Sequence, residues 1–248
     1  PLLDYVGKAI DAGVDSFLIA DPAFLIALRK ANINAEIHLS TGTTVLNSEA
    51  VKFFQDLGVS RVTLERQLTL NEIREIVENI SGIETCVFIL NSRCPNVDGL
   101  CTFMHVQFSD PSYKNACMLP YSVRLSRPRA AGETEEEKED KELASQIKQQ
   151  VWARYHMDEI PCGACALYDF EEIGVDYAKI VGRGNQTWRK VKDIEFIRLL
   201  LALLKDKNIS RQKYIERARA LYSYTYGFSC QTIRCYYPEV ITQERILV

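Results

Sequence analysis

The sequence predicts an α/β protein with a TIM-barrel-like fold that is incomplete in this chain, a cysteine-rich insertion and a helical C-terminus. Short apolar runs rich in β-forming residues alternate with amphipathic helical stretches over residues 1–92, and the alternation resumes over residues 171–248. Single helices between strands indicate right-handed βαβ units, because neighbouring parallel strands need a crossover between them. No GxGxxG follows any predicted strand, so an open dinucleotide-binding sheet loses its usual support and a barrel is favoured.

Residues 1–92 supply the βα units of the predicted barrel. Pro22 suits the first turn of one helix, and Ser48 and Thr69 are the predicted caps of the next two. From Ile73 to Ile80, apolar residues recur at i, i+3, i+4 and i+7, which is the spacing of one buried helix face. The predicted helices are 2–12, 23–31, 48–57 and 70–80, and the predicted strands are 15–20, 36–40, 61–65 and 84–91.

Residues 93–170 break this alternation. Cysteine, proline and glycine come first, and acidic residues crowd the segment 127–148, which contains GETEEEKEDKE. Like charges oppose compaction, so this run is predicted to be a mobile loop or the solvated start of a helix. Residues 171–248 then supply a closing barrel strand at 175–181, helices at 191–205 and 211–224, and an aromatic tail.

The composition excludes few functions. The chain has 248 residues, 47% of them hydrophobic, and a net charge of −3, so it can bury a sizeable core but has no general attraction to nucleic acid or to an anionic membrane. No apolar run is long enough to span a bilayer, and the first residues lack the features of a signal peptide. We therefore expect a cytoplasmic protein, in which eight cysteines need an explanation because the cytosol keeps thiols reduced.

Five cysteines lie in loop sequences suited to a metal or a cluster. Cys94 and Cys101 follow a predicted strand in RCPNVDGLC, where the loops of a barrel carry chemistry; Cys117 lies in NACMLPY, and Cys162 and Cys165 lie in PCGAC. Thiolates on loops that contain glycine or proline suit an iron–sulfur cluster, which takes four. Their spacing matches neither the short ferredoxin patterns nor a zinc ribbon. A cluster, zinc and inert thiols therefore all stay open at this point.

The other three cysteines carry less weight. Cys86 lies inside a predicted strand and is expected to be a small buried side chain. Cys230 and Cys235 could bind a metal or pair with each other, but their position and spacing favour no particular chemistry.

Three stretches of the chain resemble the collagenase-like peptidase family U-32, in the family's order. Residues 13–25 read GVDSFLIADPAFL, residues 36–76 read EIHLSTGTTVLNSEAVKFFQDLGVSRVTLERQLTLNEIREI, and residues 170–184 read FEEIGVDYAKIVGRG. This family includes the iron–sulfur, oxygen-independent hydroxylases of RNA bases and of ubiquinone biosynthesis. The match begins part-way into the family's barrel, so the resemblance implies that the first few βα units are absent from these residues.

The resemblance also implies a cofactor. Members of the family bind a [4Fe–4S] cluster through two cysteines in a short loop after a strand, one further on, and one about a dozen residues before the closing glycine. Cys94, Cys101, Cys117 and Cys162 fit this layout. Cys165 is the reserve for the fourth position.

Some of the family's polar residues are missing here. Val181 replaces the acidic residue of KIEGR, Gly42 replaces the customary glutamine, and Arg66-Gln67-Leu68-Thr69 replaces RELS. These departures affect an activity that needs those groups, but they do not affect the four cysteines.

The function favoured by the resemblance is oxygen-independent hydroxylation of an RNA base or of an aromatic or quinone precursor. Polar residues at or near the predicted strand ends would surround the substrate, and the candidate catalytic residues are His38, Glu65, Arg66, Lys179 and Arg183, with His105 beside them. Two alternatives remain for this set. His38 could be a satisfied core histidine, and Arg183 could only anchor a loop.

Two other functions stay open. The first is a cluster-bearing, non-catalytic subunit, which would pair with a second family member that completes the pocket or the barrel. The second is the peptidase of the family's name, in which Cys94 would be the nucleophile and His105 its base. Neither GxSxG nor HExxH occurs, so no hydrolytic machinery is evident.

The C-terminal segment Arg211–Tyr237 is basic and aromatic, so it could stack bases and contact phosphates. Ile215, Ala218 and Leu221 lie at helical spacing opposite its arginines. This pattern favours a helix packed on the barrel.

Overall fold

The computed structural model describes residues 2–91, 94, 96–101, 132, 134–156 and 161–242, and for residues 148, 149, 151–156 and 242 it describes the backbone alone. The chain divides into two compact units. The first comprises Pro1–Leu100 and Ile160–Val248 and holds the sheet, and the second comprises Cys101–Glu159.

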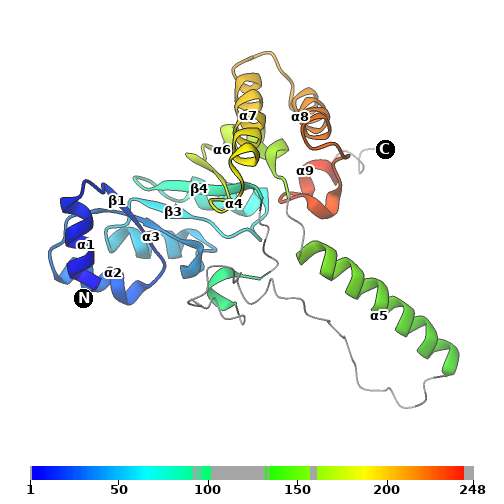
Figure 1. The fold of residues 1–248 in the computed structure, drawn as a ribbon, viewed down its shortest axis with the longest axis horizontal. Coiled ribbons are helices and arrows are strands. Elements are labelled where there is room, and N and C mark those ends of the chain that lie inside the picture. Colours follow the sequence, from blue (N-terminus) through cyan, green and yellow to red (C-terminus); the bar gives the residue numbers. More distant parts are fainter. Residues whose placement is uncertain are drawn as a thin grey trace. The chain divides into compact units, whose positions relative to one another are not determined.

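One sheet of five parallel strands forms the centre of the first unit (Figure 1), and its strands lie side by side in chain order. The strands are β1 (Ser16–Ile19), β2 (Glu36–Leu39), β3 (Arg61–Thr63), β4 (Glu84–Leu90) and β5 (Tyr177–Ile180). This order is what successive single crossovers of one hand produce. The prediction of an α/β fold with a parallel sheet is therefore confirmed.

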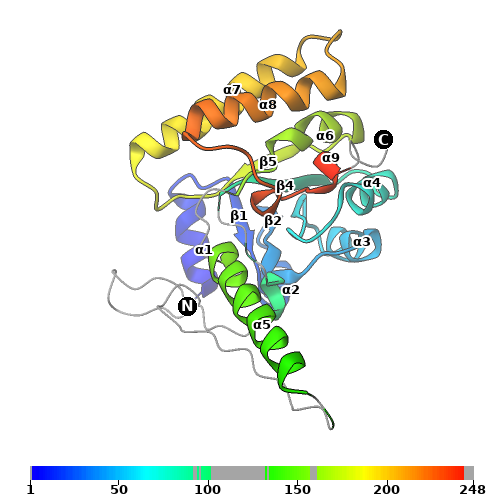
Figure 2. The same cartoon turned by 90° about the vertical axis from the view of Figure 1, so that its right-hand side faces the viewer.

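Helices follow one another along one side of this sheet (Figure 2). They are α2 (Pro22–Lys30), α3 (Ser48–Asp56), α4 (Leu70–Glu78) and α6 (Leu167–Ile173), and α1 (Leu2–Asp11) precedes β1. Alternate strand residues such as Ile37, Val62 and Ile89 are fully buried. The residues between them point to the other face of the sheet, and several of these are polar. On that face, strand register places His38 beside Arg61 and Lys179 beside the ring of Phe88.

The helix starts are fixed by local capping. Asp21 accepts a hydrogen bond from the backbone N–H of Ala23 before α2. Thr69 caps α4 as predicted, and it does so in a capping box with Glu72. The predicted cap of α3 is wrong by one residue. Asn47, with an extended backbone, accepts from the N–H of Ala50 and caps the helix, because an asparagine carbonyl caps as well as a serine hydroxyl.

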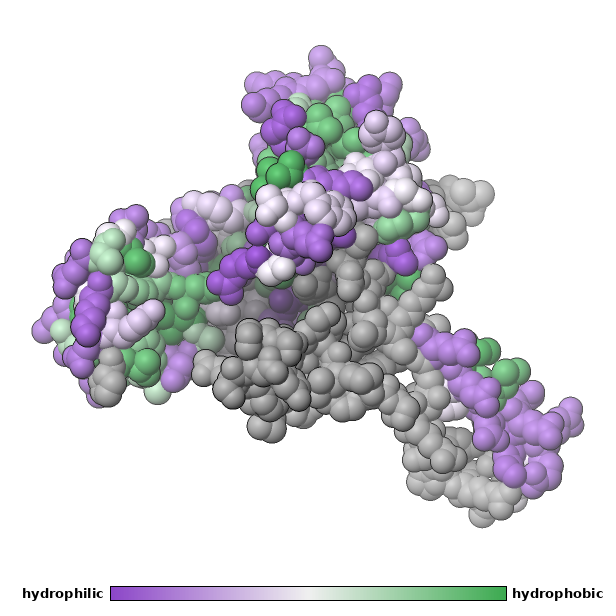
Figure 3. All heavy atoms as spheres, viewed as in Figure 1, coloured by the Kyte–Doolittle hydropathy of each residue, from purple (hydrophilic) through white to green (hydrophobic). Residues whose placement is uncertain are grey.

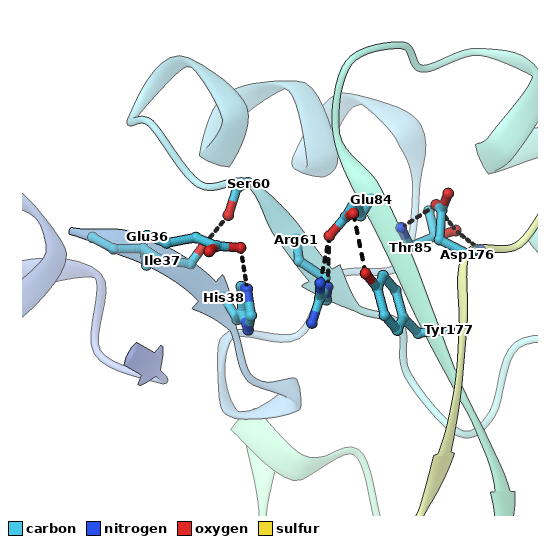
Figure 4. A network of polar contacts seen from close by, with 9 residues as sticks. All are labelled: Glu36, Ile37, His38, Ser60, Arg61, Glu84, Thr85, Asp176 and Tyr177. Atoms are coloured by element: carbon cyan, nitrogen blue, oxygen red, sulfur yellow. Dashed lines mark hydrogen bonds and ion pairs between the residues drawn. The ribbon is translucent and has the colours of Figure 1, made fainter. Parts of the chain in front are cut away.

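A polar network joins the amino ends of β2 to β5 (Figure 4). The Arg61 guanidinium lies 2.6 Å from the Glu84 carboxylate and over the ring of Tyr177, 3.5 Å from its centroid. His38 Nε2 lies 2.8 Å from Glu36 Oε1 in the same network. The amino edge of the sheet is therefore held by charged pairs rather than by apolar packing alone.

Two long helices, α7 (Thr187–Leu204) and α8 (Arg211–Tyr226), lie side by side after β5 (Figures 1 and 2). Their buried contact includes an edge-to-face pair between Phe196 and Tyr222, with ring centroids 6.1 Å apart. Helix α7 begins before the predicted Val191. Gly227 ends α8 in the left-handed conformation, and a short helix, α9 (Glu239–Thr242), follows.

The second unit contains one long helix, α5 (Glu135–His156). Within the predicted acidic loop 127–148, the residues from 135 onward are therefore helical. Thr134 and Glu137 cap this helix reciprocally through their side chains and backbone N–H groups, which explains why a run of like charges can begin a helix. Among the residues that the structure describes, no helix has the length and apolar character needed to cross a bilayer.

Candidate functional site

The carboxyl ends of parallel strands lie at one edge of a sheet, and the loops that leave this edge commonly carry binding sites. Here they form what we call the carboxyl rim: residues 40–44 after β2, 64–68 after β3, 91, 94 and 96–100 after β4, and 181–186 after β5. The rim contains two short 3-10 helices, η1 (Thr41–Thr43) and η2 (Asp98–Leu100). Most polar residues singled out from the sequence belong to it or lie next to it.

Glu65 is a buried carboxyl group at the end of β3. Its exposed fraction is 2%, and neither carboxylate oxygen has a hydrogen-bond partner in the part of the chain that the structure describes. Burial and, to a smaller extent, the nearby Asp98 carboxylate raise the pKa of Glu65 to about 7, although the Arg66 charge and the backbone N–H groups of Asp98 and Arg66 act to lower it. A buried carboxylate whose oxygens accept no side-chain hydrogen bond within the protein can accept a hydrogen bond from a ligand. With a pKa of about 7, the Glu65 carboxyl can also hold or release a proton near neutral pH.

Two cationic side chains lie beside Glu65 over one aromatic ring. The Arg66 guanidinium lies 3.9 Å from the centroid of Phe88, and Lys179 Nζ lies 5.2 Å from the same centroid. Burial lowers the pKa of Lys179. The structure thus brings the predicted residues Arg66 and Lys179 together over Phe88, and the predicted Glu65 lies within electrostatic range of Arg66 and Asp98.

The loop that carries Cys94 is tied to this cluster by Asp98. The Asp98 carboxylate lies 2.5 Å from Arg66 Nη1 and accepts a hydrogen bond from the Thr41 hydroxyl. Gln67 adds a second tie, because its Nε2 donates to the carbonyl oxygens of Cys94 at 3.2 Å and Asn96 at 2.8 Å. The loop is therefore held by side chains from the ends of β2 and β3.

Close backbone packing reinforces these ties. A Cβ atom added at Gly99 would lie 2.1 Å from Thr44 Oγ1 and 2.7 Å from the carbonyl oxygen of Gly42. Only glycine permits this approach. The loops after β2 and β4 therefore form one packed body.

Cys162 lies at the same end of β4 as Cys94. It forms an antiparallel bridge with Leu90, the last residue of β4, and the neighbouring Gly163 N–H donates to the carbonyl oxygen of Ile89 at 2.7 Å. Two of the four predicted cluster ligands thus flank the end of one strand.

The other two predicted ligands are placed differently. Cys101 belongs to the second unit, and Cys117 lies outside the described residues, as does His105. Within the described ranges, no three His, Cys, Asp or Glu side chains are grouped so that they could hold a metal ion.

Further cysteines surround Cys162. Its carbonyl oxygen accepts from the Tyr236 N–H at 3.0 Å, which places Cys235 beside it in a parallel bridge. Burial raises the pKa of the Cys162 thiol, and Cys165, Cys235 and Cys230 contribute to the shift. Cys86 is buried within β4, as predicted.

Of the remaining candidates, His38 lies apart from the Glu65 cluster, whereas the Arg183 charge lies within electrostatic range of Lys179. His38 is in β2, and its ring forms a hydrogen bond with the Glu36 carboxylate near the amino edge of the sheet. Arg183 is exposed on the rim after β5, and its carbonyl oxygen accepts from Lys190 Nζ at 3.4 Å.

A buried polar network, which was not predicted, joins the end of β4 to helices α7 and α8. Asn91, with φ of 64°, donates through Nδ2 to Asp193 Oδ2 at 2.7 Å and accepts from Arg189 Nη2 at 2.9 Å. The Tyr226 hydroxyl donates to the other Asp193 oxygen at 2.7 Å. These bonds fix the start of α7 and the end of α8 against the end of β4.

Comparison with known proteins assigns the family. The sequence profile of peptidase family U32 matches residues 1–233. The chain belongs to this family. Among curated proteins, this U32 chain is similar to tRNA hydroxylation protein P of Escherichia coli, with 31% identity over 119 residues, which cover 46% of this chain and 26% of that protein.

Two further relatives bear related names. The chain is 34% identical over 116 residues to tRNA hydroxylation protein P1 of Bacillus subtilis, covering 47% of the chain and 27% of the relative. It is 30% identical over 118 residues to a 23S rRNA 5-hydroxycytidine synthase of Escherichia coli, covering 45% and 17%. The U32 chain thus spans about a quarter or less of the length of these three relatives.

Proposed function

We propose that this U32 chain belongs to an oxygen-independent RNA-base hydroxylase and that its carboxyl rim binds the target base beside a [4Fe–4S] cluster. Relatives named for tRNA hydroxylation and for 5-hydroxycytidine synthesis support the substrate class. The observation that carries the proposal is the buried Glu65 carboxyl, whose oxygens accept no side-chain hydrogen bond, within electrostatic range of Arg66 and of Asp98 in the loop that contains Cys94. Five parallel strands in chain order are the arrangement expected of part of a β/α barrel.

The donor chemistry of the rim suits an iron–sulfur cluster. Cys94, Cys101, Cys117 and Cys162 would hold it, since thiolates are its usual ligands. Support comes from Cys94 and Cys162, which flank the end of β4, and from the Arg66 cation, which lies within electrostatic range of the Cys94 thiol. When bound, such a cluster supplies one-electron transfer at the site.

The chain's own polar residues would position the base. The Glu65 carboxylate would accept a ring or exocyclic N–H of the base, or take up a proton, because its pKa of about 7 allows both states. Arg66 and Lys179 would bind carbonyl oxygens or phosphate of the nucleotide. Asp98 holds Arg66 in place and so limits how far that cation can move.

The product of the reaction tests this proposal. The chain would be expressed in cells that lack their own enzyme, and nucleosides from total RNA would be measured by mass spectrometry. We expect a nucleoside one oxygen atom heavier with the wild type, its loss with Glu65→Gln, and its retention with Cys86→Ala, a buried cysteine outside the predicted ligand set. The absence of any new hydroxylated nucleoside with soluble, cluster-loaded wild type would overturn the hydroxylase proposal and favour a non-catalytic partner subunit.

A further inference from the structure

The α7 and α8 segment is strongly basic within an acidic chain. Residues 183–226 contain eleven Lys or Arg and four Asp or Glu, a net charge of +7, whereas the whole chain has a net charge of −3. A local excess of cations of this size attracts polyanions even when the overall charge is negative.

Helix α8 exposes one stripe of this charge. Lys213, Arg217 and Tyr224 recur at i, i+4 and i+11, all three are exposed, and Tyr224 is 88% exposed. The opposite face packs Tyr214 and Ala218 into the core. The predicted helix with a packed face is thus confirmed, and its outer face carries two cations and an unburied aromatic ring.

Helix α7 exposes a stripe of two cations, Arg198 and the C-cap Lys205, which are seven residues apart and so lie within about 20° of each other around the helix axis. Trp188, at the start of α7, is 62% exposed and lies about a quarter of a turn away from this stripe. Over the region of α7 and α8, Figure 3 shows hydrophilic side chains with apolar ones between them. Both helices therefore expose an aromatic residue near one end and cations further along.

The two aromatic ends meet beside the carboxyl rim. The Tyr226 hydroxyl donates to Asp193, which joins the end of α8 to the start of α7. Arg189, next to Trp188, donates to Asn91 just after β4. Trp188 and Tyr224 thus lie at the end of the hairpin nearest the rim, and the cationic residues lead away from it.

We propose that the exposed stripes of α7 and α8 bind single-stranded RNA next to the target base. Trp188 and Tyr224 would stack on unpaired bases near the rim, and Lys213, Arg217 and Arg198 would contact phosphates. Sequence-independent binding of single strands uses this combination of exposed aromatic rings and a line of cations. The inference rests on the proposed function, because it treats RNA as the substrate.

RNA affinity measured by fluorescence anisotropy tests the surface, with a labelled uridine oligonucleotide and an unmodified tRNA transcript as probes. The variant is Lys213→Ala, Arg217→Ala and Tyr224→Ala combined. The control is Tyr5→Ala with Lys8→Ala on α1, where Tyr5 is 71% exposed and Lys8 is exposed. We expect at least about a tenfold weaker Kd for the variant, a salt dependence that is shallower by about 1.4 in slope, and no change for the control.

Three results would contradict this surface: unchanged affinity and slope in the triple variant, an equal loss in the control, or binding to anionic phospholipid vesicles without binding to RNA. Glu65→Gln separates this inference from the proposed function, because that variant leaves the cations of α7 and α8 in place and should therefore keep the wild-type salt slope of RNA binding while making no hydroxylated nucleoside. A wild type that hydroxylates RNA while the triple variant binds as tightly would refute the surface alone. A wild type that binds through the hairpin but makes no product would refute the activity alone.

Discussion

The Arg66 guanidinium lies 2.5 Å from the Asp98 carboxylate and thereby joins the end of β3 to the loop that contains Cys94. Both side chains are largely buried, with exposed fractions of 11% and 18%. The pair is thus shielded from solvent more than a typical surface ion pair, and its loss leaves a cation without its partner.

Asp98→Asn should destabilise the protein by about 1–3 kcal/mol, because it leaves the Arg66 charge buried and uncompensated. Urea unfolding followed by circular dichroism measures this change. The matched control is Glu84→Gln, which breaks the more exposed pair with Arg61 at the amino edge and should cost less than about 1 kcal/mol. Equal losses in the two variants would mean that burial of the Asp98 pair has no special effect.

Gln67→Ala should loosen the loop that carries Cys94, because it removes both hydrogen bonds to the carbonyl oxygens of Cys94 and Asn96. Hydrogen exchange of peptides covering residues 94–100 should become faster, and the loaded protein should lose its visible absorbance faster in air. Gln55→Ala is the control, since Gln55 also donates from its side chain to a backbone carbonyl, that of Ser81. If exchange in the loop stays at the wild-type rate, Gln67 does not position it.

Glu65 should make stability fall as pH rises. Its folded pKa of about 7 lies above the ordinary value of 4.5, so the folded state binds one proton more than the unfolded state between these values, and the free energy of unfolding falls as pH rises through this range and stays low above it. Glu65→Gln should therefore be more stable than the wild type at pH 8, by on the order of 1–3 kcal/mol, with little difference at pH 4.

Glu72 is the control for this prediction, because its effect on stability should change with pH in the opposite direction. Its pKa is lowered by the hydrogen bonds from Thr69, so its contribution is present above pH 4.5 and is lost as pH falls through the folded value. Glu72→Gln should therefore reduce stability at pH 7 and have little effect at pH 3. A Glu65→Gln curve parallel to the wild type across pH 4–8 would show that the Glu65 carboxyl is not perturbed.

Cys162→Ala should abolish cluster binding, whereas Cys165→Ala should retain it. Cys162 lies in the backbone bridge at the end of β4, and Cys165 is buried in the short helix that follows. Iron and sulfide analysis after anaerobic purification measures both variants. Full iron content in Cys162→Ala would exclude it as the fourth ligand.

Features set by neighbouring residues were predictable from the sequence. The Thr69 cap depends on residues three apart, Pro22 suits the first turn of α2, and the alternation of strands and helices follows from local periodicity. The cap of α3 shows the limit, since Asn47 and Ser48 both suit that position and the backbone selects Asn47.

The site was predictable only in part, for the same reason. Glu65 and Lys179 stand at the ends of recognisable strands, so strand geometry places them on one edge. Asp98 and Gln67 act through contacts across 27 to 57 residues, and nothing near them in the sequence indicates those partners.

Gly99 has a consequence for the evolution of this chain. A side chain there would strike Thr44 and the Gly42 backbone, so any replacement must push the η1 and η2 loops apart. Those loops also hold Thr41 and Asp98 in contact. A substitution at position 99 can therefore disable the site without altering any chemically reactive group. A mutational scan that looks only for lost cysteines, acids and bases would overlook such a substitution.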